Sequence, residues 1–165
     1  MVGSRRGRRT GAGVLVAAGL MLSSCTDAPG GSTPPASATR ADPGPLRSDE
    51  GPLTGRFAAL GDPVAVSWRS GTTGDPAVPG PSTYWIDAAV RLTPATAAEL
   101  AAGPGLSPAE LPADLPADVR AAAGNGPWRA GESLDRALSS AGFGTRAFIA
   151  GDVVVLRAVG SGEPG

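Results

Sequence analysis

The chain holds few residues that could carry chemistry. It has 165 residues, one cysteine (Cys25), no histidine, and 14 basic residues that are all arginine. It therefore lacks an imidazole base, the commonest zinc ligand, and a lysine amine for Schiff-base chemistry. What remains is the thiol of Cys25 and carboxylates such as Asp87, Glu132 and Asp152.

These carboxylates give only weak support to an enzyme. Paired acids can hydrolyse glycosides, but such enzymes need a substrate cleft, and a domain of about 100 residues with few aromatics rarely forms one. Asp87, Glu132 and Asp152 also stand in no recognisable motif. We interpret them as surface acids and expect no catalytic residue and no metal site. Whether the chain is an enzyme stays uncertain, with the sequence leaning against it.

The residues before Cys25 have the order of a secretory signal. A basic block (Arg5, Arg6, Arg8 and Arg9) precedes an apolar run at 11–22. This run is shorter than the roughly 20 apolar residues that a membrane-spanning helix needs. A basic region followed by a short apolar segment and small residues is typical of an export signal.

Leu22-Ser23-Ser24-Cys25 resembles the lipobox of bacterial lipoproteins. The resemblance implies a signal peptide at 1–24, cleavage before Cys25, and a diacylglyceryl lipid on its thiol as the sole attached group, with no cofactor. The alternative is a free thiol beside an ordinary cleavage site. Since two acyl chains hold a protein stably, the resemblance implies a membrane-lipid partner and a location at the outer face of the cell membrane.

The export route is left open. Ser4-Arg5-Arg6 is similar to a twin-arginine signal, but Arg8 stands where that class prefers a large apolar residue. A general basic region is our preferred interpretation.

Composition constrains the partners. From Cys25 on, the chain carries 10 basic and 15 acidic residues, a net charge of −5, which opposes nucleic-acid binding. With 25 Gly, 17 Pro and only arginine as base, the composition is similar to that of high-G+C genomes, such as actinobacterial ones. One cysteine also excludes a disulfide within the chain.

We predict three regions after the signal. Residues 25–54 are rich in Pro, Gly, Ser and Thr and should form a lipid-anchored disordered linker. Residues 55–160 should form a single domain, and 161–165 a disordered tail. The predicted class is α+β: a small antiparallel sheet of about four strands with helices on one face.

The predicted strands come from alternating or β-rich runs. One covers 63–69 and another 83–92, where Tyr84, Ile86 and Ala88 begin one face. Two further strands flank Gly151-Asp152, a short hairpin turn. Helices are predicted from Thr93-Pro94 to 102, from Ser107, over 117–123 and over 132–141, ending near Gly142.

A two-residue turn at Gly151-Asp152 would place Arg146 opposite Arg157. Since like charges opposite one another are unfavourable, an acid or an anionic ligand could lie between them. The alternative is a register that differs by one residue, with both arginines in water or paired to Asp87. Trp85 and Arg91 are also predicted on outer strand faces, so the candidate binding face consists of Trp85, Arg91, Arg146 and Arg157. Arg69, on an outer face as well, could extend it.

The sequence therefore predicts a lipid-anchored extracytoplasmic lipoprotein whose role is a non-catalytic binding or interaction module, with an envelope protein as a candidate partner. The alternatives are a small envelope hydrolase that uses carboxylates and a solute-binding accessory protein. The oligomeric state is unknown from the sequence.

Overall fold

The computed structural model describes residues 40–41, 43–73 and 83–161. The predicted signal peptide with Leu22, Ser23 and Ser24, the lipidation site Cys25, the linker up to residue 39 and residues 162–165 lie outside the described residues.

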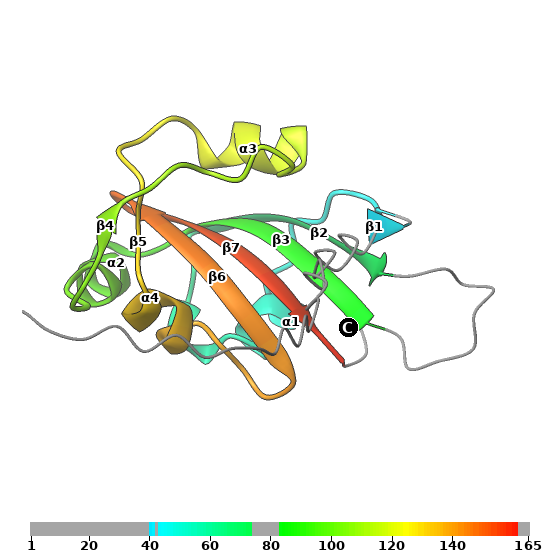
Figure 1. Ribbon diagram of the computed structural model, residues 1–165, viewed down its shortest axis with the longest axis horizontal. Coiled ribbons are helices and arrows are strands. Elements are labelled where there is room, and N and C mark those ends of the chain that lie inside the picture. The colour runs from blue at the N-terminus through cyan, green and yellow to red at the C-terminus, as the bar shows by residue number, and fades with distance from the viewer. Residues whose placement is uncertain (1–39, 42, 74–82, 162–165) are drawn as a thin grey trace, which may run out of the picture. The chain divides into compact units, whose positions relative to one another are not determined.

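The described residues form an antiparallel sheet of seven strands (Figure 1). Their order across the sheet is β1-β2-β3-β7-β6-β5-β4. The bounds are β1 (Arg40–Ala41), β2 (Ala65–Thr73), β3 (Thr83–Arg91), β4 (Ser107–Pro108), β5 (Arg129–Ala130), β6 (Phe143–Ala150) and β7 (Val153–Gly160). The predicted α+β class is confirmed. The strand count exceeds the predicted four because three two-residue strands extend the four long ones.

Local sequence signals account for the long strands. On β3, Ile86, Ala88 and Val90 point to one face and are buried, as their alternation predicts. The β6–β7 hairpin turns at Gly151-Asp152 with Ala150 opposite Val153, also as predicted. Gly151 has a φ of 59°, a conformation that glycine adopts without steric cost.

The helices are α1 (Gly51–Thr54), α2 (Pro94–Ala101), α3 (Ala117–Ala123) and α4 (Glu132–Ala137), with the 3₁₀ turn η1 (Ala58–Leu60). The predicted start of α2 is confirmed, because the Thr93 side chain accepts a hydrogen bond from the Thr96 N–H at 3.3 Å. The predicted helix from Ser107 is wrong. Ser107 and Pro108 form β4, because pairing with β5 outweighs the local helix signal.

Helix α4 is shorter than predicted. It ends at Ala137 rather than near residue 141, and Ala137 is exposed. The chain then turns, with the Phe143 N–H donating to the Ser140 carbonyl, and enters β6. Leu134 and Leu138 are buried in one core cluster, whereas Ala137 and Ala141 are exposed.

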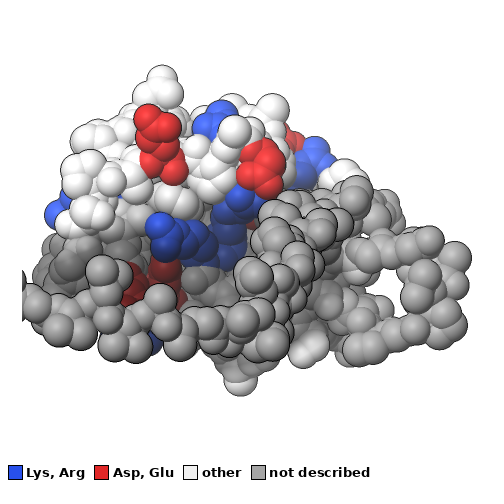
Figure 2. Space-filling view, viewed as in Figure 1, with Lys and Arg blue, Asp and Glu red and all other residues white. Residues whose placement is uncertain are grey.

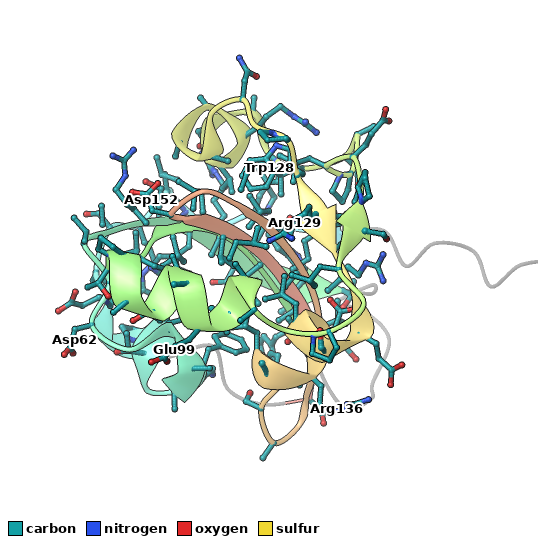
Figure 3. All side chains as sticks on the ribbon, turned by 90° about the vertical axis from the view of Figure 1, so that its left-hand side faces the viewer. Asp62, Glu99, Trp128, Arg129, Arg136 and Asp152 are labelled. Carbon is teal, nitrogen blue, oxygen red and sulfur yellow. The ribbon has the colours of Figure 1, made fainter. Side chains whose placement is uncertain are left out.

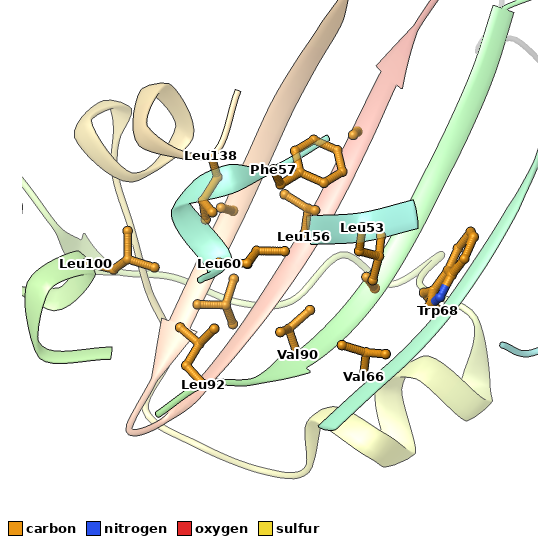
Figure 4. Packing of buried hydrophobic residues seen from close by; sticks show 14 of the residues in the cluster. Leu53, Phe57, Leu60, Val66, Trp68, Val90, Leu92, Leu100, Leu138 and Leu156 are labelled. Atoms are coloured by element: carbon orange, nitrogen blue, oxygen red, sulfur yellow. The ribbon is translucent and has the colours of Figure 1, made fainter. Parts of the chain in front are cut away.

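The main core lies on one face of the sheet, the first face. Side chains of β2, β3, β6 and β7 pack there against α1, η1, α2 and α4 (Figure 4). Leu53, Phe57, Leu60 and Trp68 are at most 1% exposed in this cluster. The Trp68 indole N–H donates to the Asp49 carbonyl at 2.9 Å.

The position of Leu53 corrects the predicted linker boundary. The linker predicted at 25–54 is wrong at its C-terminal end, because residues 51–54 form α1 and Leu53 is completely buried. Leu53 and Phe57 lie four residues apart and enter the core together. The folded unit therefore begins before Gly55.

A second cluster corrects the prediction that helices cover one face only. Val119 and Ala123 of α3 pack with Ala89, Phe148 and Val155, which alternate with first-face residues along their strands. Helix α3 thus covers part of the opposite face of the sheet, the second face. In Figure 1, α3 lies on the other side of the sheet from α1 and α4.

Candidate functional site

A row of charged residues crosses the second face beside α3. The register aligns Arg69 with Asp87, Asp87 with Arg157, and Arg157 with Arg146. The predicted opposition of Arg146 and Arg157 is therefore confirmed. Basic and acidic side chains are also interspersed on the face seen in Figure 2.

Internal carboxylates surround Arg157. Its Nε donates to Asp87 at 3.1 Å, and its two terminal nitrogens donate to Asp114 at 2.8 Å. Asp87 is fully buried and the Arg157 side chain is 16% exposed. Burial lowers the pKa of Arg157, but the hydrogen bonds and charges of Asp114 and Asp87 outweigh burial, so its pKa is raised. The acid expected beside Arg157 thus comes from the chain itself.

The other residues of the predicted binding face do not share one open surface. Trp85 is 1% exposed, and its indole N–H donates to the Thr72 carbonyl at 3.2 Å. Arg146 is 60% exposed and lies 3.3 Å from Asp135, while Arg91 is exposed at the end of β3. The prediction that all four residues point outward is wrong for Trp85, because a bulky aromatic side chain is favoured in the interior.

Arg69 and Asp118 form a second link between the sheet and α3. The Arg69 Nε donates to Asp118 at 2.7 Å, and Arg69 also donates to the Gly44 carbonyl at 2.5 Å. The hydrogen bond from Arg69 lowers the pKa of Asp118. This ion pair holds the start of α3 over β2.

The Arg69–Asp118 pair predicts acid sensitivity. Because the pKa of Asp118 is lower when folded than unfolded, its contribution is present above the unfolded pKa of about 3.9 and is lost as the pH falls through the folded pKa. We expect Asp118→Asn to be less stable than the wild type at pH 6, with the difference shrinking at pH 3. Urea unfolding at both pH values measures this. Asp62→Asn, at an exposed residue, is the control. An Asp118→Asn deficit that does not change with pH would contradict the prediction.

The three acids considered for catalysis lie on separate elements. Asp87 is paired within the sheet, Glu132 pairs with Arg136 on α4, and Asp152 is exposed in the hairpin turn. Within the described ranges, no three carboxylates or cysteines are grouped so that they could hold a metal ion.

A hollow lies at the edge of the sheet that β4 and β5 form, and we call it the β5 groove. It has a volume of about 690 Å³ and is lined mainly by apolar groups, among them Pro108, Trp128 and Ile149, with Ala101 at the end of α2. Figure 3 shows Trp128 and Arg129 at β5. Trp128 is 8% exposed and also lines an adjoining hollow of about 380 Å³.

The groove forms where strand pairing stops. β5 pairs with β6 through Arg129 and Ile149. The next opposite residues would be Trp128 and Ala150, and the next pair that could exchange hydrogen bonds would be Pro127 and Gly151. Pro127 has no N–H to donate, which ends the ladder there. Gly126 then approaches the hairpin closely, since a Cβ at this position would lie 2.7 Å from that of Ala150.

Two charged side chains of opposite sign line the groove, Glu110 and Arg129. Arg129 donates to the Ala101 carbonyl at 3.3 Å, at the C-terminal end of α2. Sequence reasoning missed this site because it interpreted 107–110 as a helix start. The adjacent Trp128 and Arg129 were the available signal, since these residue types are enriched at binding hot spots.

No protein family, no curated protein and no solved structure matches the chain. None of the described helices has the length and apolar character to cross a membrane.

Proposed function

We propose that this protein is a lipid-anchored extracytoplasmic module that binds a ligand in the β5 groove without catalysing a reaction. The anchor is the diacylglyceryl group expected on Cys25, and the location is the outer face of the cell membrane. The anchor proposal is supported by Leu22-Ser23-Ser24-Cys25 and the signal-like residues before it.

The observation that carries the binding proposal is the groove itself. Ligand sites are usually concave, about 300–1,000 Å³ in volume, mostly apolar, and supplied with a few polar groups. The β5 groove has this size, apolar walls including Trp128, and the charged groups Glu110 and Arg129. It favours a small ligand, or a short segment of a larger partner, over a flat protein interface.

The groove gives less support to the hydrolase alternative. A two-carboxylate mechanism needs a pair of acids across the scissile bond. Among the described residues that line the groove, Glu110 is the one acid. The solute-binding alternative remains compatible with the same groove.

The test is photocrosslinking in native membranes. A photoreactive residue that replaces Pro108, on the groove wall, should crosslink to the ligand. The same photoreactive residue in place of Asp62, which lies outside the groove, should not. Ala101→Leu fills part of the groove and should lower capture about tenfold, equivalent to about 1.4 kcal/mol of binding free energy.

The matched control is Ala102→Leu, an exposed neighbour that does not line the groove. It should leave capture unchanged. Mass spectrometry identifies the adduct, and thermal unfolding verifies that both variants are folded. Capture at Pro108 that is absent, or that Ala101→Leu does not reduce, would reject the groove as the binding site.

A further inference from the structure

We infer that the β5 groove binds an apolar dipeptide by both of its free ends, the carboxylate at Arg129 and the ammonium group at Glu110. This inference rests on the proposed function and specifies the ligand. It follows from the charges, their spacing and the walls of the groove.

The two groove charges are complementary to a zwitterion. No ion pair joins Glu110 to Arg129 or to another residue in the described part of the chain, and Arg129 has the neutral Ala101 carbonyl as a hydrogen-bond partner. A guanidinium binds a carboxylate through charge-assisted hydrogen bonds, and a carboxylate binds an ammonium group in the same way. Both side chains are exposed, and a ligand with one charge could pair with only one of them.

Strand register sets the spacing of these charges. Pro108 pairs with Arg129, and the Ala109 N–H donates to the Trp128 carbonyl at 2.9 Å, which continues the pairing toward Glu110. Glu110 is therefore two residues along the ladder from the partner of Arg129. At about 3.3 Å per residue, the backbone offset along the strands is about 6.6 Å, and with about 4.8 Å between the strands the two backbone positions lie about 8 Å apart. An extended dipeptide spans about 7 Å, which is close to this backbone separation.

The walls select the side chains of the peptide. Trp128, Ile149, Pro108 and Ala109 surround the volume between the charges. Burying apolar side chains against such walls is favourable in proportion to the area removed from water. A peptide with leucine side chains should thus bind more tightly than one of glycine.

The experiment is calorimetric titration of the full chain, purified from membranes and reconstituted in phospholipid nanodiscs, with Leu-Leu. N-acetyl-Leu-Leu lacks the ammonium group, Leu-Leu-amide lacks the carboxylate, and Gly-Gly lacks the apolar side chains. We expect saturable Leu-Leu binding that each terminal block weakens about tenfold, with Gly-Gly weaker than Leu-Leu.

Two substitutions assign the peptide ends. In Glu110→Gln, acetylation of Leu-Leu should no longer weaken binding, whereas amidation still should. In Arg129→Gln the pattern should reverse. Glu99→Gln and Arg136→Gln, exposed charges that do not line the groove (Figure 3), should behave like the wild type. All four substituted side chains are exposed, so we expect the four variants to fold.

Three results would each overturn the inference. The first is the absence of saturable Leu-Leu binding up to about 1 mM. The second is Leu-Leu binding that neither terminal block weakens. The third is an effect of the terminal blocks that is the same in Glu110→Gln and Arg129→Gln as in the wild type. If Leu-Leu does not bind in the titration but Ala101→Leu still lowers crosslinking in membranes, the peptide inference is wrong and the groove remains the binding site. If both fail, the proposed function is wrong as well.

Discussion

Replacing Arg157 by leucine is expected to destabilise the protein by about 3–5 kcal/mol, because it removes the guanidinium that pairs with the buried Asp87 carboxylate. Asp87 is 0% exposed and lies 3.1 Å from Arg157. Since small domains are stable by only about 5–15 kcal/mol, a loss of this size should unfold a substantial fraction of the protein at moderate temperature. Urea unfolding of the wild type and the variant measures it.

Arg146→Leu is the matched control. Arg146 lies directly opposite Arg157 on the neighbouring strand, but its side chain is 60% exposed, and its pair with Asp135 is at the surface. Exposed ion pairs contribute less than about 1 kcal/mol. Equal losses for Arg157→Leu and Arg146→Leu would show that burial of Asp87 does not determine the effect.

A double substitution separates lost pairing from lost packing. Asp87→Asn removes the buried charge, so we expect Asp87→Asn with Arg157→Leu to be more stable than Arg157→Leu alone. The neutral amide is less costly to bury than a carboxylate that has lost its pairing with Arg157. If the double variant is instead the less stable one, the loss in Arg157→Leu arises from side-chain packing.

Replacing Cys25 by alanine is expected to abolish lipid attachment completely. The thiol is the attachment atom that the lipobox resemblance implies, and Cys25 is the single cysteine of the chain. Metabolic labelling with an alkyne fatty acid, followed by membrane fractionation, measures the effect. The variant should carry no label and be found either released or as an uncleaved precursor.

Ser32→Ala, a substitution beyond the lipobox, should leave labelling unchanged. Signal-peptide cleavage provides an independent readout. Peptide mapping should find Cys25 as the first residue of the wild-type protein. In an uncleaved variant it should find residue 1 or 2 instead. Persistent fatty-acid label on Cys25→Ala would reject the anchor.

Several features followed from short stretches of sequence. The alternation on β3, the cap of α2 at Thr93 and the turn at Gly151-Asp152 were predicted and are present. Each depends on interactions between residues a few positions apart, or on which side of a strand a residue points. The signature that ends at Cys25 is equally local, because it consists of consecutive residues.

Other features depended on distant partners. Ser107 and Pro108 became a strand rather than a helix start because β5 offers hydrogen bonds to them. Leu53, predicted to lie in a linker, is buried because it packs against the apolar side chains on the first face of the sheet. Neither partner can be recognised from the residues nearby.

By itself, the sequence determined the α+β class, the succession of the four long strands along the chain, and the register that sets Arg146 against Arg157. It also contains the motif on which the proposal of a lipid anchor rests. Only the tertiary structure decided which charges are buried and which surfaces are hollow. Asp87 is 0% exposed and paired to Arg157, and the β5 groove opens where Pro127 ends the β5–β6 ladder. Periodicity assigns a residue to one side of a strand, but burial depends on which elements pack there, and those elements come from elsewhere in the chain.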